Sequence, residues 1–407
     1  MPANLEMNDL GSRRERAPEA QRVASTRRRN ALHNAKVPFP FVIEAERALA
    51  LLRAERDRTH RNAAGIDCGE VPWPNAERDH GRTFMKPRGT EHKVFDPRDG
   101  SLAATGDELL DASVARRDDA WWMCLAGQAH GQGAPNIFSA TLPRGAPLSA
   151  QGWTPARDAS GELRPLAGKD HSGTWDEAGG RHCPAYARGW DPRKGRWIER
   201  IYYAGGAESA RGPYRIGYLE WNGARWVDQP SPCFEATEDW EHGSVYEPNL
   251  VWHGGKWRLW YVAGSNRENY LVHGYAESDD GEHWGPHAMF APEGMRMFDF
   301  CVRRRGDGFG AVFARLHLGR DAPPPETGLW WCRAGEPSGR LEDWSEPVQI
   351  MTAEDRGWHR GPFKPSLEFG EDGRAWIFFD GMYDTGDPGP FPFALTLGCL
   401  EIELPDH

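Results

Sequence analysis

The sequence is poor in the features that mark membrane, secreted and disulfide-stapled proteins. No stretch approaches the roughly 20 consecutive apolar residues that a membrane-spanning helix needs. Its first residues lack the apolar run of a secretory signal peptide, so we expect a cytoplasmic protein with no membrane partner. No two cysteines have the CxxC spacing of a metal or redox motif. We interpret the seven cysteines as small buried apolar residues, at positions 68, 124, 183, 233, 301, 332 and 399.

Positive charge is also scarce. The chain holds 49 Lys and Arg against 60 Asp and Glu, and this acidic balance argues against nucleic acid, which binds to basic faces. The start of the chain differs, because residues 1–60 carry twelve Lys and Arg against eight Asp and Glu. We interpret this basic segment as a solvated extension, with an arm that binds nucleic acid or a partner, or that forms an oligomer, as the alternative.

Helical periodicity is confined to one segment near the N-terminus. In residues 41–60 the apolar side chains that fall on one helical face are Val42, Ala45, Leu49 and Leu52. We therefore predict an N-terminal extension over residues 1–80 with a short amphipathic helix, followed by one domain over residues 81–407.

Turn-forming and aromatic residues, by contrast, are abundant. The chain contains 47 Gly, 32 Pro and 19 Trp, which supply turns and the large flat side chains that fill the space between twisted sheets. Between the turns, apolar and polar residues alternate, as is typical of strands.

One pattern recurs five times: a polar residue at the head of a strand, a tight turn, and then an aromatic strand. The five heads lie 52 to 72 residues apart, at Asp111, Cys183, Glu247, Asp299 and Lys364. This spacing is too long for a solenoid repeat and suits a four-stranded blade with variable loops. The sequence therefore predicts an all-β fold, a five-bladed β-propeller.

The last copy, followed to residue 404, provides three strands instead of four. We expect residues 82–95, which precede the first copy, to add the missing strand. Such a strand would close the ring without an exposed sheet edge.

These motifs carry a resemblance to a known group of enzymes. Tyr-Glu247-Pro-Asn-Leu followed by His-Gly-Gly-Lys-Trp-Arg-Leu-Trp-Tyr, together with Asp111-Ala-Ser-Val and its aromatic strand, resembles the five-bladed propeller glycoside hydrolases, family 43 and its relatives. The resemblance covers roughly residues 80–404. It implies that the strand heads meet in a pocket at the propeller axis, with Asp111 as the catalytic base and Glu247 as the catalytic acid.

The second blade departs from the family pattern. Where the family has an aspartate that orients and tunes the acid, this chain has Cys183, and a neutral thiol carries no fixed negative charge. We expect Asp176, Glu177 or Asp299 to replace that carboxylate, or else the chemistry to differ. Asp299, as head of the fourth copy, is included among the catalytic candidates.

Polar and aromatic clusters precede several heads and should line the same pocket. Aromatic rings stack on sugar faces, Arg and His bond to hydroxyl groups, and a lysine suits an anionic group. The predicted substrate-binding residues are Arg181, His182, Trp240, Glu241, His242, Trp358, His359, Arg360 and Lys364. A structural role is an equal alternative for each histidine, and a metal site formed by three histidines with Glu241 or Glu247 is a further alternative.

Two functions are compatible with these residues. The first is a glycosidase that cleaves a small glycoside or oligosaccharide by carboxylate acid/base catalysis and requires no cofactor. The second is a propeller with an altered site, which acts on other chemistry with a metal ion at the axis or serves as a carbohydrate-binding module. The pair Asp111 and Glu247 favours the first, and Cys183 favours the second.

Overall fold

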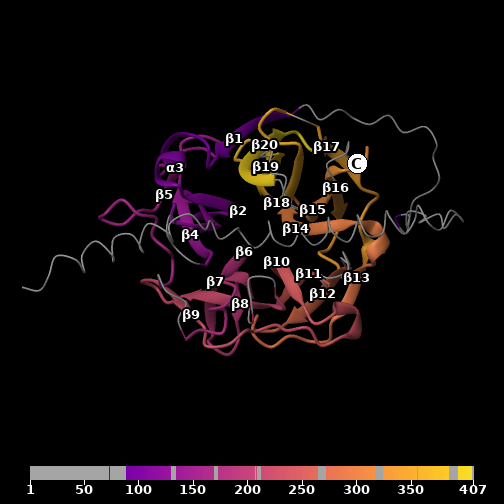
Figure 1. The fold of residues 1–407 in the computed structure, drawn as a ribbon. Coiled ribbons are helices and arrows are strands. Elements are labelled where there is room, and N and C mark those ends of the chain that lie inside the picture. Colours follow the sequence, from indigo (N-terminus) through magenta and orange to yellow (C-terminus); the bar gives the residue numbers. More distant parts are fainter. Residues whose placement is uncertain are drawn as a thin grey trace, which may run out of the picture. The chain divides into compact units, whose positions relative to one another are not determined.

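Five antiparallel sheets, each of four strands, are arranged around a common centre (Figure 1). The computed structural model describes residues 73, 89–129, 134–168, 173–206, 208, 212–264, 272–316, 324–354, 356–384 and 393–405. Within them the predicted all-β, five-bladed propeller is confirmed. The helix predicted for residues 41–60 and the domain boundary at residue 80 lie outside the described residues.

In the first four blades the strands pair in chain order. The first blade consists of β2 (Glu108–Arg117), β3 (Ala120–Gln128), β4 (Asn136–Thr141) and β5 (Thr154–Pro155). The second consists of β6 (Arg181–Asp191), β7 (Arg196–Gly206), β8 (Tyr214–Trp221) and β9 (Trp226–Asp228). The third consists of β10 (Val245–His253), β11 (Lys256–Ala263), β12 (Val272–Ser278) and β13 (Ala288–Ala291). The fourth consists of β14 (Met297–Arg305), β15 (Gly308–Arg315), β16 (Gly328–Ala334) and β17 (Val348–Thr352).

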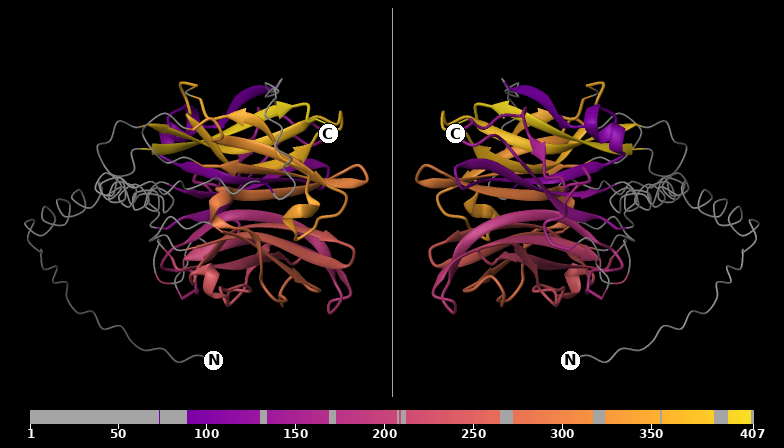
Figure 2. Two further views of the ribbon diagram at one scale, coloured as in Figure 1. Left: turned by 90° about the vertical axis from the view of Figure 1, so that its right-hand side faces the viewer. Right: turned by 90° about the vertical axis from the view of Figure 1, so that its left-hand side faces the viewer.

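The fifth blade joins the two ends of the domain. It consists of β18 (Gly361–Phe369), β19 (Ala375–Asp384), β20 (Phe393–Ile402) and β1 (Thr90–Phe95). Thr90 lies opposite Glu401 in the antiparallel pair, and the indigo β1 runs beside the yellow strands in Figure 2. The predicted closing strand is therefore confirmed for residues 90–95, while residues 82–88 are not described.

Helix is scarce in the described part of the chain. It consists of α3 (Gly100–Thr105) and three single 3-10 turns, η1 (Asp239–Glu241), η2 (Glu293–Met295) and η3 (Leu341–Asp343). Among these described helices, none has the length and apolar character needed to cross a membrane.

The innermost strands form a closed ring, in which β2, β6, β10, β14 and β18 each contact the next and β18 contacts β2. Aromatic side chains fill the space between neighbouring blades. Trp122 stacks on Trp226 with ring centres 5.9 Å apart between the first and second blades, for example. Trp73, from the predicted extension, packs on the fourth blade, where its ring centre lies 6.1 Å from that of Phe313.

The cysteines in the described residues are unpaired, and all but the half-buried Cys233 are buried. They behave as the small core residues that the sequence predicted, apart from Cys183, which lies at the propeller axis. Cys68 is outside the described residues.

Candidate active site

Every innermost strand contains one residue with a left-handed backbone, and in each blade it is the predicted strand head. The φ angles are 51° at Asp111, 52° at Cys183, 52° at Glu247, 55° at Asp299 and 52° at Lys364. The pairing with the second strand shifts register at each point, as at a β-bulge that re-aims a side chain. A left-handed residue other than glycine costs about 1–3 kcal/mol, and such strain is concentrated at functional sites. The heads thus lie two or three residues inside their strands, not at the first residue as predicted.

Cys183 connects the two carboxylates that the resemblance assigns to catalysis. Its backbone N–H donates to Asp111 Oδ2 at 3.1 Å, and its thiol donates to Glu247 Oε1 at 3.1 Å. Burial, reinforced by the negative charges of Glu247 and Asp111, raises the pKa of Cys183 well above its ordinary value. Cys183 therefore stands where a charged carboxylate was expected and acts as a neutral hydrogen-bond donor.

Lys364 places a positive charge on the other side of Glu247. Its ammonium pairs with Glu247 Oε2 and lies 3.5 Å from Asp299 Oδ1. Its backbone N–H also donates to Asp299 Oδ2 at 2.9 Å. Burial alone would lower the pKa of Lys364, but the charges of Glu247 and Asp299 raise it well above its ordinary value. The lysine charge is thus already matched by protein carboxyl groups, which weakens the expectation that it binds an anionic substrate group.

Asp299 differs from a solvated carboxylate in its surroundings. Burial raises the pKa of Asp299 well above its ordinary value, and the negative charge of Glu247 acts in the same direction, while the charge of Lys364 opposes them. Two carboxyl groups that share one site favour a state in which one of them keeps its proton. The direction of the shift favours the protonated form of Asp299.

The sequence pattern did not reveal a second pair of carboxyl residues at the axis, Asp111 and Asp380. The backbone N–H of Asp111 donates to both carboxyl oxygens of Asp380, at 3.2 and 3.1 Å. Burial, followed by the charge of Asp111, raises the pKa of Asp380 well above its ordinary value. Asp380 lies on β19, the second strand of its blade, whereas the sequence pattern marks the first strands. The available signal was a lone carboxyl group directly after Phe378 and Phe379.

Asp380→Asn is expected to stabilise the fold increasingly as pH rises above about 4, the ordinary pKa of an aspartate. Because the folded state raises the pKa of Asp380, its favourable contribution is complete below that pH and is lost as pH climbs towards the folded-state pKa. Asparagine keeps an acceptor for the Asp111 N–H and has no charge to bury. Thermal melts from pH 4 to 8, compared with those of the exposed control Asp239→Asn, measure the difference. A constant offset between variant and wild type would contradict the prediction.

His273, on β12, was missed as well. It is buried, and neither ring nitrogen has a hydrogen-bond partner among the described residues. Burial, with a smaller effect of Lys364, lowers the pKa of His273 to about 3. The imidazole is therefore neutral and adds no positive charge beside Lys364.

The predicted binding residues of the second blade are engaged with neighbouring groups. Arg181 is buried between Asp176, 2.7 Å away, and Asp228, also at 2.7 Å. One ring nitrogen of His182, Nε2, lies 2.7 Å from the Gly179 carbonyl oxygen. Asp176 therefore pairs with Arg181 and does not take the place of the missing carboxylate.

The predicted residues of the third blade surround a buried turn. Glu241 accepts hydrogen bonds from two backbone N–H groups, from the Tyr261 hydroxyl at 2.6 Å and from His287 Nδ1 at 2.7 Å. Burial alone would raise the pKa of Glu241, but these donors, His287 first, lower it. Trp240 stacks on Tyr261 with ring centres 6.3 Å apart, and His242 is exposed. This cluster fixes the entry to β10.

In the fifth blade the predicted residues lie beside the closing strand. His359 Nε2 is 3.2 Å from a carboxylate oxygen of Glu91, on β1. Trp358 stacks on Phe379 with ring centres 6.1 Å apart, and Arg360 is half-buried.

The structure thus brings together four of the predicted site residues, Asp111, Glu247, Asp299 and Lys364, and adds Asp380. Of the three carboxylates suggested to replace the missing one, Asp299 is the member in contact with this axial cluster; Asp176 pairs with Arg181, and Glu177 accepts from the Gly173 N–H at 2.8 Å. The roles of the other predicted residues as substrate ligands stay predictions.

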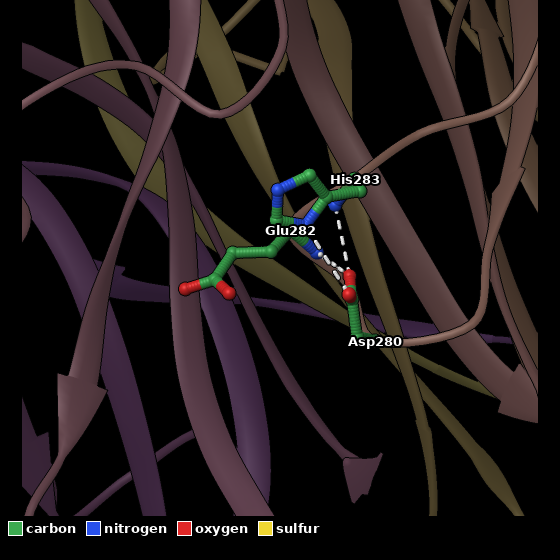
Figure 3. Close-up of side chains that lie close together, drawn as sticks. All are labelled: Asp280, Glu282 and His283. Carbon is green, nitrogen blue, oxygen red and sulfur yellow. Dashed lines mark hydrogen bonds and ion pairs between the residues drawn. The ribbon is translucent and has the colours of Figure 1, made fainter. Parts of the chain in front are cut away.

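In the described part of the chain, a single group brings three potential metal ligands within 4.8 Å of one another: Asp280, Glu282 and His283, on the turn after β12 (Figure 3). Arg193 pairs with both carboxylates of this group, at 2.9 Å from Asp280 Oδ2. Asp280 Oδ1 also accepts the backbone N–H groups of Glu282 and His283, at 2.7 and 2.8 Å. These carboxylates therefore bind an arginine and shape the turn, and the group contains none of the histidines predicted as alternative ligands.

Comparison with known proteins supports the fold. No family model matches the sequence, and no curated protein matches it. A Coprinopsis cinerea α-L-arabinofuranosidase of glycoside hydrolase family 62 has a similar structure, with a TM-score of 0.53, 14% identity, and coverage of 78% of this chain and 97% of that one. A family 117 glycoside hydrolase of the marine bacterium Zobellia galactanivorans is similar with a TM-score of 0.53 and 11% identity, over 78% of this chain and 92% of that one. A Podospora anserina α-L-arabinofuranosidase, solved in complex with cellotriose, is similar with a TM-score of 0.51 and 11% identity, over 79% of this chain and 98% of that one. The chain has the five-bladed propeller fold of these hydrolases.

Proposed function

We propose that this protein is a glycoside hydrolase-like enzyme that cleaves a small glycoside or oligosaccharide with the carboxyl groups at the propeller axis. One observation carries the proposal: Asp111 and Glu247 each accept a hydrogen bond from Cys183, at 3.1 Å, so that two candidate carboxyl groups flank a single residue. Cleavage of a glycosidic bond uses two such groups, one to protonate the leaving oxygen and one to activate water or to attack the sugar. The hydrolases of similar fold support this proposal.

The axial cluster contains further carboxyl groups, and their surroundings differ. Acid and base roles are separated when the surroundings push the pKa values of two carboxyl groups apart. Burial favours the protonated forms of Asp299 and Asp380. Asp111 Oδ1 receives no hydrogen bond from an N–H group of the described residues. The resemblance to family 43 gives Asp111 the role of accepting a proton from water.

The proposal is tested by assaying the full chain against 4-nitrophenyl glycosides, beginning with α-L-arabinofuranosides, and against oligosaccharides by release of reducing sugar. We expect turnover by the wild type and its loss in Asp111→Asn. If neither protein hydrolyses any substrate but both bind one by calorimetry, the propeller is a carbohydrate-binding module. Cys183, which supplies no charge where the family 43 pattern has an aspartate, is the observation that favours this second function.

Chelation of divalent metals is expected to leave turnover unchanged, because side chains would both transfer the proton and activate the water. The measurement is the rate before and after exhaustive treatment with a chelator, with a thermal melt to detect any change in stability. A loss of rate without a loss of stability, restored by one transition metal, would assign the chemistry to a metal ion instead.

A further inference from the structure

Exposed tryptophans gather at the hairpin of β6 and β7. Among the described residues, the large apolar side chains that stay exposed are Trp190 at 38%, Trp197 at 46% and Met289 at 44%. Trp190 and Trp197 lie opposite each other in the strand pair, with ring centres 6.3 Å apart. The half-buried Trp252, on β10, adds a third ring, whose centre is 4.8 Å from that of Trp197. These three residues form one contiguous tryptophan surface, unlike the scattered apolar residues of an ordinary protein surface.

The tryptophan surface lies at the other end of the inner strands from the axial cluster. Cys183 and Trp190 are both on β6, seven positions apart, which is roughly 23 Å at about 3.3 Å per residue. On β10, Glu247 and Trp252 are likewise separated along one strand. A ligand on the tryptophan surface therefore does not contact the axial carboxyl groups.

An arginine lies beside the tryptophan surface with its charge uncompensated. The guanidinium carbon of Arg188, which is exposed, lies 5.5 Å from the centre of the Trp197 ring. The neighbouring basic residues Lys194 and Arg196 both pair with Glu220. No carboxylate in the described part of the chain forms an ion pair with Arg188. The surface thus combines an apolar ring with a positive charge that is available to an anion.

The size of the surface limits what it can bind. The exposed fractions of Trp190 and Trp197 together amount to less than one whole indole, on the order of 200 Å². A stable interface between proteins buries about 800 Å² on each partner. The tryptophan surface is therefore too small for a second copy of the chain, and it suits one or two rings of a small ligand.

We propose that the tryptophan surface and Arg188 bind a uronic acid unit of an anionic oligosaccharide, at a second site apart from the axis. The C–H face of the sugar packs on an indole, and its carboxylate pairs with the guanidinium. A uronic acid carries both features on one ring, as a guanidinium beside an indole requires. Binding at this site needs no hydrolysis, so the inference does not rest on the proposed function.

The test titrates the full chain with tetragalacturonate and, separately, with its methyl ester, which has the same sugars without the charges. We expect calorimetry to show tighter binding of the acid, which weakens as salt is added. Trp197→Ala should weaken the binding of both by about tenfold. Arg188→Gln should weaken the binding of the acid alone, to the affinity of the ester. Arg196→Gln, a matched change at an arginine that pairs with Glu220, should alter neither.

The axial site is separated from the tryptophan surface by the same titration of Asp111→Asn, which should bind the acid as the wild type does. The inference is overturned if the wild type does not bind the acid, if Trp197→Ala and Arg188→Gln bind it unchanged, or if Asp111→Asn alone abolishes binding. A wild-type dimer that Trp197→Ala dissociates in sedimentation would also overturn it, because the surface would then join two copies. Thermal melts check that each variant is folded, and Trp190→Ala replaces Trp197→Ala if the latter is not.

Discussion

Asp111→Asn is expected to reduce the turnover of every glycoside substrate by about 100-fold to 10,000-fold, whatever the leaving group. The attacking water needs a base in each case, and an amide nitrogen or oxygen does not accept a proton at neutral pH. The amide can still accept the Cys183 N–H, which the carboxylate does at 3.1 Å, so the local structure should persist.

The chain offers a closely matched control for this change. Asp118 lies on the exposed turn between β2 and β3 and also has a left-handed backbone, with φ of 47° against 51° at Asp111. Asp118→Asn therefore makes the same chemical and conformational change at the other end of β2 and should retain the wild-type rate. Steady-state kinetics on two substrates with different leaving groups measure the effect. Equal and small losses in both variants would mean that the axis binds its ligand without using Asp111 for catalysis.

Lys364→Met is expected to lower the free energy of unfolding by about 3–5 kcal/mol at neutral pH, the usual cost of removing one partner from a buried ion pair. Glu247 and Asp299 would remain buried beside an apolar side chain, without the ammonium that now contacts both. The loss should shrink in acid, because carboxyl groups that take up protons no longer need a positive neighbour. Urea unfolding at neutral and acidic pH provides the measurement.

A double variant and a surface control make the stability test specific. Lys364→Met combined with Glu247→Gln should be more stable than Lys364→Met alone, because the unpaired charge is removed with its partner. Lys256, whose ammonium pairs with Asp279 at 2.6 Å on the surface, should tolerate the change to methionine with little loss. Additive effects of the two axial substitutions would show that Lys364 and Glu247 do not form a pair in solution.

The fold could be predicted because each blade repeats the same local pattern. A polar head, a tight turn and an aromatic strand identify the first two strands of a blade without any knowledge of their neighbours. Because the blades form a ring, their first strands meet at one axis. The five heads could therefore be named from the sequence, although the bulge that places each of them two or three residues inside its strand has no signal in the residue types.

The environment of those heads could not be predicted, because it comes from residues far away in the chain. Asp380 contacts Asp111 across 269 positions, and Lys364 contacts Glu247 across 117. Protonation depends on these contacts and on burial, so the sequence shows that carboxyl groups are present but not which one keeps a proton. Three predicted substrate-binding residues, Arg181, Glu241 and His359, were misjudged for the same reason. Their polar groups bind to protein neighbours that the local sequence pattern does not reveal.

The strand that closes the ring also determines when folding can be completed during synthesis of the protein. β1 is translated about 300 residues before β20, which is its partner in the sheet, so at about 5–20 residues per second it waits about 15–60 s without that partner. Contacts this distant in sequence form late in folding, and an unpaired strand edge is a site of aggregation in the meantime. The propeller can therefore close only after β20 has been synthesised. We expect the nascent chain to depend on chaperones that hold exposed strands until its last blade is complete.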